Sequence, residues 1–259
     1  SEMCIRDRPN AFTTEFPSDL KVYLLGGEKV AEHQPLYATD LLPGLPFTYP
    51  PFAGVVFSWL TESTALGIAW KTLSVLVVLL VARASTSKHA LLLTAVFVLC
   101  LSPVQGTLFF GQVNLLLMGL VCLDFLPRYR LPGIGVGLAA GLKLTPAFFI
   151  LLLIQQRRWG AVFIAAFTFL CTVATGFSEV TDAKTFWTDA IFRTTRIGAD
   201  DNPGAQSIRQ VLARAGYDEP WLWLVLSALV TALGLFASRR APAPLAVSFI
   251  GMTACLVSP

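Results

Sequence analysis

Residues 64–82 read TALGIAWKTLSVLVVLLVA, a stretch that is almost entirely apolar. A helix needs about twenty consecutive apolar residues to cross the hydrocarbon core of a bilayer. Working outward from this stretch, further apolar runs that we interpret as spans lie near 89–102, 112–126, 159–177, 220–238 and 244–257. The sequence therefore predicts an all-α, polytopic integral membrane protein.

The composition of the whole chain favours the same class. Of its 259 residues, 55% are hydrophobic and 14% are charged, and the mean hydropathy is +0.66. Such a chain has too little polar surface to cover a soluble globule. The net charge of +3 comes mostly from short Lys/Arg clusters between apolar runs, which is typical of orientation signals rather than of a nucleic-acid patch. We expect membrane lipids as partners, and no nucleic acid.

The segment 132–155 determines the predicted orientation. If it crossed the bilayer once, the later basic clusters would lie on the opposite side from the earlier ones. If it breaks at Thr145-Pro146 into two half-helices, all clusters share one side, as the positive-inside rule prefers. We therefore predict a broken, re-entrant segment with the basic residues on the cytoplasmic side. These residues are Arg83, Lys88, Arg128, Arg130, Arg157, Arg158, Arg239 and Arg240.

This orientation predicts three segments on the outer face: 9–63, a turn at 102–111 and a loop at 178–219. Within the first, residues 51–60 are apolar but too short to cross a bilayer, so we predict an interfacial helix there. The transmembrane domain would then be 64–259. Loops as long as 178–219 are usually functional or disordered. Its polar and aromatic residues include Trp187, Arg193, Arg196, Asp200, Asp201, Asn202 and Gln206.

Both ends of the chain indicate a fragment. Residues 1–8 contain no apolar core of a signal peptide, and we interpret them as a non-native leader. The last apolar run stops at Leu256-Val-Ser-Pro259 without a polar tail. We therefore expect a protein truncated at both ends.

A few polar residues beside apolar runs are candidates for chemistry. Asp19 could act as a general base, although a solvated loop carboxylate is the ordinary alternative. Lys143 could hold a phosphate inside a polar cavity, or could instead reach the lipid headgroups. Gln112 and Asn114 follow Gly111 at a helix start, where amides bind anions or sugar hydroxyls but also cap helices.

The aromatic, cysteine and glycine residues have structural interpretations as well as functional ones. Tyr23, Tyr37 and Tyr49 could stack on a sugar or a prenyl chain, but aromatic residues are common at bilayer interfaces. The glycines in 133–141 fit close helix packing better than nucleotide binding. Four cysteines lie inside apolar runs, and the chain has no P-loop, paired CxxC or HExxH motif, so we expect no metal and no cofactor.

Six motifs, taken in order along the chain, resemble glycosyltransferase family 87. This family consists of membrane enzymes of the GT-C superfamily. The resemblance covers residues 17–259. The motifs are Asp19-Leu-x-Val-Tyr23, Leu36-Tyr37, Pro46-Phe-Thr-Tyr-Pro-Pro51, Gly111-Gln-Val-Asn114, Lys143-Leu-Thr-Pro146 with Arg157-Arg-Trp159, and Gln206-Ser207.

The resemblance implies a GT-C-like helical bundle on the bacterial plasma membrane. It implies inverting transfer of a sugar, typically mannose, from a polyprenyl-phosphate donor to a lipid or glycan acceptor on the outer face, with Asp19 as the general base. It also implies a helix before this chain and a histidine-containing segment after it, so we expect the fragment itself to be inactive. The residues we place at the substrates are Tyr23, Tyr49, Gln112, Asn114, Lys143 and Gln206.

One alternative function remains open from the sequence. A protein that binds or translocates polyprenyl lipids could use the same outer-face cavity without transferring a sugar. Such a protein needs no general base, so Asp19 separates the two hypotheses.

Overall fold

A computed structural model describes residues 16–87, 90–126, 131–192, 206–217 and 219–258. Within these residues the regular structure is helical, apart from an isolated bridge between Leu42 and Leu45. The elements are α2 (Ser18–Ala31), α3 (Pro51–Phe57), α4 (Thr64–Ser85), α5 (Leu91–Cys100), α6 (Ser102–Phe110), α7 (Asn114–Phe125), α8 (Ile134–Leu142), η1 (Thr145–Phe149), α9 (Ile150–Gln155), α10 (Trp159–Glu179), α11 (Ala183–Thr188), η2 (Ala190–Phe192), α12 (Ile208–Arg214), α13 (Pro220–Ser238) and α14 (Ala243–Val257).

The long apolar helices match the predicted spans. In the described part of the chain, α4, α10 and α13 are each long and apolar enough to cross a bilayer core. The pair α5 and α6 passes the same test together and is bent by 68°. Helices α7 and α14 are shorter and lie in the predicted spans 112–126 and 244–257. The chain is an all-α polytopic membrane protein, as the sequence predicted.

The turn expected at 102–111 is wrong in most of its length, because residues 102–110 form α6. A proline lies in the first turn of this helix, where its missing N–H costs nothing. The true turn is confined to the residues between α6 and α7, and it begins at Gly111.

Residues 131–158 form a helical hairpin between α7 and α10. At its base, Arg158 donates hydrogen bonds to the backbone oxygens of Asp124 (2.8 Å) and Leu131 (3.4 Å), so the chain returns to the end of α7 that it left. At its tip, Lys143 reaches Asn114 at the opposite end of α7. The predicted break of this segment into two half-helices is confirmed. The break falls at extended Lys143, slightly earlier than expected, because Pro146 fits within the first turn of η1.

Glycines bring α8 into backbone contact with α10. A Cβ atom at Gly137 would lie 2.6 Å from the carbonyl oxygen of Ala165, and one at Gly141 would lie 2.6 Å from the Cβ atom of Thr172. Only glycine permits so close an approach of two helices. The predicted helix-packing role of the glycines in 133–141 is confirmed.

A buried carboxylate anchors the base of the hairpin. Asp124 on α7 is fully buried and accepts the backbone N–H groups of Gly133 (2.9 Å) and Val136 (2.7 Å). These amides open α8 and have no partner inside their own helix. Asp124 is not among the predicted site residues, although an acid inside an apolar run is a signal for a paired, buried charge.

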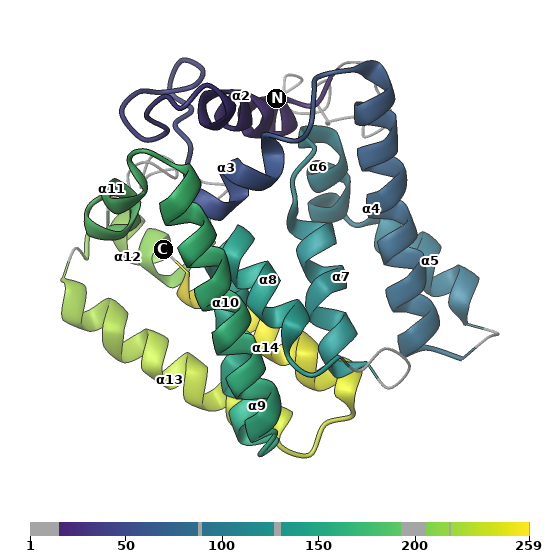
Figure 1. Ribbon diagram of the computed structural model, residues 1–259. Coiled ribbons are helices and arrows are strands. Elements are labelled where there is room, and N and C mark those ends of the chain that lie inside the picture. The colour runs from purple at the N-terminus through teal and green to yellow at the C-terminus, as the bar shows by residue number, and fades with distance from the viewer. Residues whose placement is uncertain (1–15, 88–89, 127–130, 193–205, 218, 259) are drawn as a thin grey trace, which may run out of the picture.

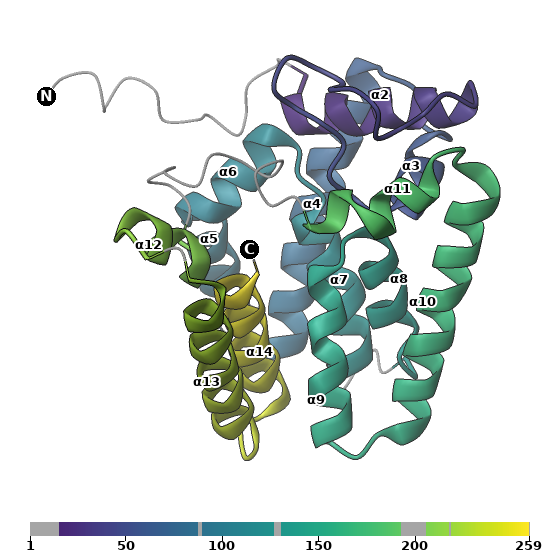
Figure 2. The same ribbon diagram turned by 90° about the vertical axis from the view of Figure 1, so that its left-hand side faces the viewer.

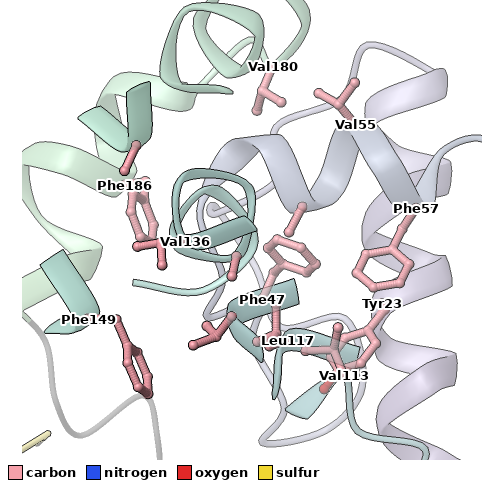
Figure 3. Close-up of a cluster of buried hydrophobic side chains, with 14 of the residues drawn as sticks. Tyr23, Phe47, Val55, Phe57, Val113, Leu117, Val136, Phe149, Val180 and Phe186 are labelled. Carbon is pink, nitrogen blue, oxygen red and sulfur yellow. The ribbon is translucent and has the colours of Figure 1, made fainter. Parts of the chain in front are cut away.

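Residues 16–63 cover one end of the bundle, where α2 runs across the other helices (Figure 1 and Figure 2). The buried positions Leu20, Tyr23, Leu24 and Val30 recur at helical spacing and form the inner face of α2. Tyr23 stacks on Phe57 of α3 (Figure 3), and the ring centroids are 4.9 Å apart. The sequence predicted the short helix now seen as α3, but it did not predict α2.

The described members of the basic clusters that set the predicted orientation lie at the end of the bundle opposite α2, where α4 and α13 end and α10 begins (Figure 1). Arg83 lies in the last turn of α4, Arg157-Arg158 immediately precede α10, and Arg239-Arg240 immediately follow α13. The other predicted basic residues, Lys88, Arg128 and Arg130, lie outside the described residues. We call the end of the bundle that holds these clusters the basic end; the other end carries α2 and the hairpin tip.

Candidate active site

Asp19 occupies the first turn of α2. The helix follows Pro17, whose ψ of 131° is extended rather than helical. First-turn N–H groups have no partner within the helix, and the positive end of the helix dipole lies there, so this position stabilises a carboxylate. The side chain is only partly buried. Asp19 thus lies on a helix start rather than in an irregular loop.

Gly111 brings Gln112 to the start of α2. Its φ of 70° is left-handed, a conformation that glycine adopts without strain. A Cβ atom here would lie 2.5 Å from Cβ of Pro17 and 3.0 Å from Cβ of Leu20. The turn between α6 and α7 therefore packs directly against α2, which sets Gln112 beside Asp19.

Four predicted site residues form one chain of hydrogen bonds. Gln112 Nε2 donates to Asp19 Oδ2 at 2.9 Å. Asn114 Nδ2 donates to Gln112 Oε1 at 2.9 Å, and Lys143 Nζ donates to Asn114 Oδ1 at 3.0 Å. A carboxylate and an ammonium group are thus joined through two amides at the α2 end of the bundle. We call these four residues the polar chain.

Lys143 brings a positive charge to the polar chain from the tip of the hairpin. Its ammonium lies 5.6 Å from the ring centroid of Tyr49, within the range of cation–π attraction. Among the described residues, no carboxylate lies within ion-pair distance of it. A partly buried cation with amide and aromatic neighbours suits an anionic ligand.

Tyr49 lies beside Lys143 of the polar chain, and Tyr23 contacts Tyr49. Their hydroxyl groups are 2.8 Å apart, and the Tyr37 hydroxyl donates to the backbone oxygen of Tyr49 at 2.8 Å. Burial raises the pKa of Tyr49 to about 12, with the charge of Asp19 adding to this and the Tyr23 hydrogen bond opposing it. Burial, Tyr49 and the Asp19 charge raise the pKa of Tyr23 well above its usual range. Both hydroxyls are therefore neutral at physiological pH.

The exposure of these tyrosines bears on their predicted contact with substrate. Tyr23 is only 2% exposed, and Tyr49 is partly buried. The ring of Tyr23 packs against the rings of Tyr49 and Phe57 (Figure 3 shows the stack with Phe57). A role for either tyrosine in substrate binding stays a prediction.

Asp182 is a residue of this region that the sequence analysis missed. Its two carboxylate oxygens accept the backbone N–H groups of Leu36 (2.8 Å) and Tyr37 (2.7 Å). The acid directly precedes α11, a position usually occupied by a helix cap, but its side chain caps none of the α11 amides. It instead fastens the segment after α2 to the end of α10.

Other predicted residues lie apart from the polar chain or outside the described residues. Gln206 is exposed and precedes the N-cap of α12, a helix that contacts α13 and α14. The hydrogen bonds of the polar chain do not include it. Trp187 lies on α11 and contacts Phe169 and Phe186. The remaining loop residues, Arg193, Arg196, Asp200, Asp201 and Asn202, fall in the part that the structure does not describe.

Comparison with known proteins gives a consistent set of relatives. A polyprenol-phosphate-mannose-dependent alpha-(1-2)-phosphatidylinositol mannoside mannosyltransferase of Mycolicibacterium smegmatis is 34% identical, over 86% of this chain and 58% of the relative. A protein of the same name from Mycobacterium tuberculosis is also 34% identical, over 95% of this chain and 66% of the relative. A phosphatidylinositol pentamannoside mannosyltransferase of M. tuberculosis is 32% identical, over 82% of this chain and 54% of the relative.

This chain thus spans 54 to 66% of the length of these curated relatives. No solved structure gives a significant match. The family model of glycosyltransferase family 87 matches residues 47–259, which include three of the four residues of the polar chain. With most of the chain matched by the family model and by these relatives, the protein belongs to glycosyltransferase family 87.

Proposed function

We propose that this protein transfers mannose from a polyprenyl-phosphate donor to a lipid or glycan acceptor, with inversion at the anomeric carbon. The observation that carries the proposal is the polar chain, which links a carboxylate to a cation next to apolar helices. The relatives' names supply the donor, and their acceptors are phosphatidylinositol mannosides. A phosphatidylinositol mannoside is therefore the acceptor class that we propose for this protein.

The two ends of the polar chain suit the two halves of the reaction. At one end, Asp19 takes the proton of the acceptor hydroxyl, and that oxygen forms a bond to the anomeric carbon. At the other end, the bond between this carbon and the phosphate oxygen breaks, and its electron pair stays on the polyprenyl phosphate. Lys143 offsets the charge of the departing phosphate. This scheme uses no metal ion and no cofactor.

The first experiment measures transfer of labelled mannose from polyprenyl-phosphate mannose to a phosphatidylinositol mannoside, in membranes that contain the full-length protein. We expect transfer by the wild type. Lys143→Met keeps the length of the side chain but removes the charge, so we expect the donor KM to rise about tenfold or more. The fold should persist, because methionine fits an apolar setting.

Two outcomes of this experiment are informative in different ways. If the wild type transfers no mannose from the polyprenyl-phosphate donor, the proposed function is wrong. If the wild type is active and Lys143→Met leaves both donor KM and kcat unchanged, only the assignment of Lys143 is wrong, and the side chain merely reaches toward the headgroups.

We further propose that the α2 end of the bundle faces the outside of the cell, because the described basic clusters lie at the other end. In a variant without native cysteines, Asp40→Cys would introduce an exposed thiol near α2, and Gln156→Cys one at the basic end. An impermeant maleimide added to intact cells should label position 40 and spare position 156. Labelling of both positions, or of position 156 alone, contradicts this orientation.

A further inference from the structure

We propose that Gln112 positions the Asp19 carboxylate for proton abstraction, an inference that rests on the proposed function. Its Nε2 group donates to Oδ2 of Asp19 at 2.9 Å. The backbone of Gln112 is itself fixed, since its N–H donates to the backbone oxygen of Thr107 (2.9 Å) and the preceding Gly111 packs against α2. The donor group therefore approaches the carboxylate from an anchored main chain.

The direction of every hydrogen bond in the polar chain is set by its two ends. An ammonium group can only donate, and a carboxylate can only accept. Lys143 therefore turns the oxygen of Asn114 toward itself, which turns the Asn114 amide nitrogen toward Gln112. Gln112 must then present its own nitrogen to Asp19. The charge on the hairpin tip thereby determines which group of Gln112 faces Asp19.

This arrangement leaves the two oxygens of Asp19 in different positions. Oδ2 is held by Gln112, whereas the only described partner of Oδ1 is the hydroxyl of Ser18 at a long 3.4 Å. Ser18 is exposed, and Asp19 is partly so. The geometry thus points to Oδ1 as the oxygen that receives the acceptor proton, with Oδ2 serving as the fixed point of the carboxylate.

The test is a double-mutant cycle on mannose transfer by the full-length protein. Gln112→Leu removes the donor, and we expect kcat to fall about 10- to 100-fold, the range for a misplaced catalytic group, with donor and acceptor KM little changed. In an Asp19→Asn background, no base remains to be positioned. There we expect Gln112→Leu to lower kcat by less than about twofold.

A second variant separates donation from shape. Gln112→Glu keeps the shape of the side chain but lacks the N–H group and places a second carboxylate beside Asp19. We expect its kcat at pH 7 to be no higher than that of Gln112→Leu. Recovery to near wild-type turnover by Gln112→Glu would mean that the side chain only fills space, and the positioning role would be wrong. Elution as a single species in detergent checks that each variant is folded.

The cycle also separates failure of this inference from failure of the proposed function. If Asp19→Asn is strongly impaired and Gln112→Leu still costs 10-fold or more in that background, Gln112 acts on substrate directly and the positioning role is wrong. If the wild type transfers no mannose, the proposed function is wrong. If it does and Asp19→Asn retains near-normal turnover, the assignment of Asp19 as the general base is wrong, and Gln112 has no base to position.

Discussion

Replacement of Asp19 by asparagine should lower mannose transfer by about 10²- to 10⁴-fold, the usual contribution of a general acid–base group. Asparagine keeps the size of the side chain and can still accept a hydrogen bond from Gln112 Nε2. It cannot take a proton from the acceptor hydroxyl, so the loss should appear in kcat rather than in donor KM. The measurement is steady-state transfer from polyprenyl-phosphate mannose in membranes that contain equal amounts of each full-length variant.

Asp40 provides a matched control for this substitution. It is another acid of the segment that covers the α2 end, and its side chain is exposed. Asp40→Asn should therefore leave turnover within about twofold of the wild type, as is usual for a surface change. Near-normal transfer by Asp19→Asn would contradict the proposed mechanism. A wild type that transfers no mannose would instead favour a protein that binds or translocates polyprenyl lipids.

Substitution of Gly137 by alanine should destabilise the protein by about 1–3 kcal/mol, the range for overpacking a filled core. The added Cβ atom would meet a carbonyl oxygen of α10 at 2.6 Å, and a backbone atom cannot move aside as the end of a side chain can. Helices α8 and α10 must therefore separate. Since α8 ends directly before Lys143, we also expect the donor KM to rise.

Gly106→Ala is the matched control for this prediction. Gly106 lies inside α6, and a Cβ atom there would meet no atom within 4 Å. Alanine should stabilise that helix by up to about 1 kcal/mol, because it has the higher helix propensity. Thermal unfolding in detergent compares the two variants. Equal unfolding temperatures for both would show that the close contact between α8 and α10 does not limit stability.

The membrane-spanning architecture could be predicted because lipid imposes a length and an apolar composition on every span. The stretch at 64–82 and the structure's α4 differ by only a few residues at one end. The hairpin could also be predicted from charge. Arg157-Arg158 and Arg239-Arg240 lie on the same side as the earlier basic residues only if 132–155 turns back, and the positive-inside rule favours that arrangement. Its break was misplaced because proline is compatible with the first turn of η1.

Shorter elements were missed where tertiary contacts, rather than lipid, determine them. Helix α2 contains Gly26-Gly27, which interrupts its apolar pattern in the sequence. In the structure these glycines are needed for packing, because a Cβ atom at Gly27 would lie 2.5 Å from the carbonyl oxygen of Phe57. The spacing of Leu20, Tyr23 and Leu24 was the available signal for this helix.

The candidate site was predictable in its residue types but not in its connections. The motifs that resemble those of the family contain Asp19, Gln112, Asn114 and Lys143. The structure brings all four together. No spacing rule relates α2 to the turn after α6, so the sequence could not show that Gln112 contacts Asp19. The expected substrate-binding role of Gln112 is accordingly extended by the positioning role that its hydrogen bond supports.

The polar chain also has a consequence for the order of events during synthesis. Gln112 lies 93 positions after Asp19, and Lys143 lies 29 positions after Asn114. At about 5–20 residues per second, Asp19 leaves the ribosome roughly five to twenty seconds before its hydrogen-bond partner exists. Until α6 and α7 are inserted, the start of α2 lacks the turn at Gly111 that packs against it, and an amphipathic helix can lie at the membrane surface in the meantime. The carboxylate of Asp19 is thus synthesised first, and the other residues of the polar chain, which orient it, are synthesised later.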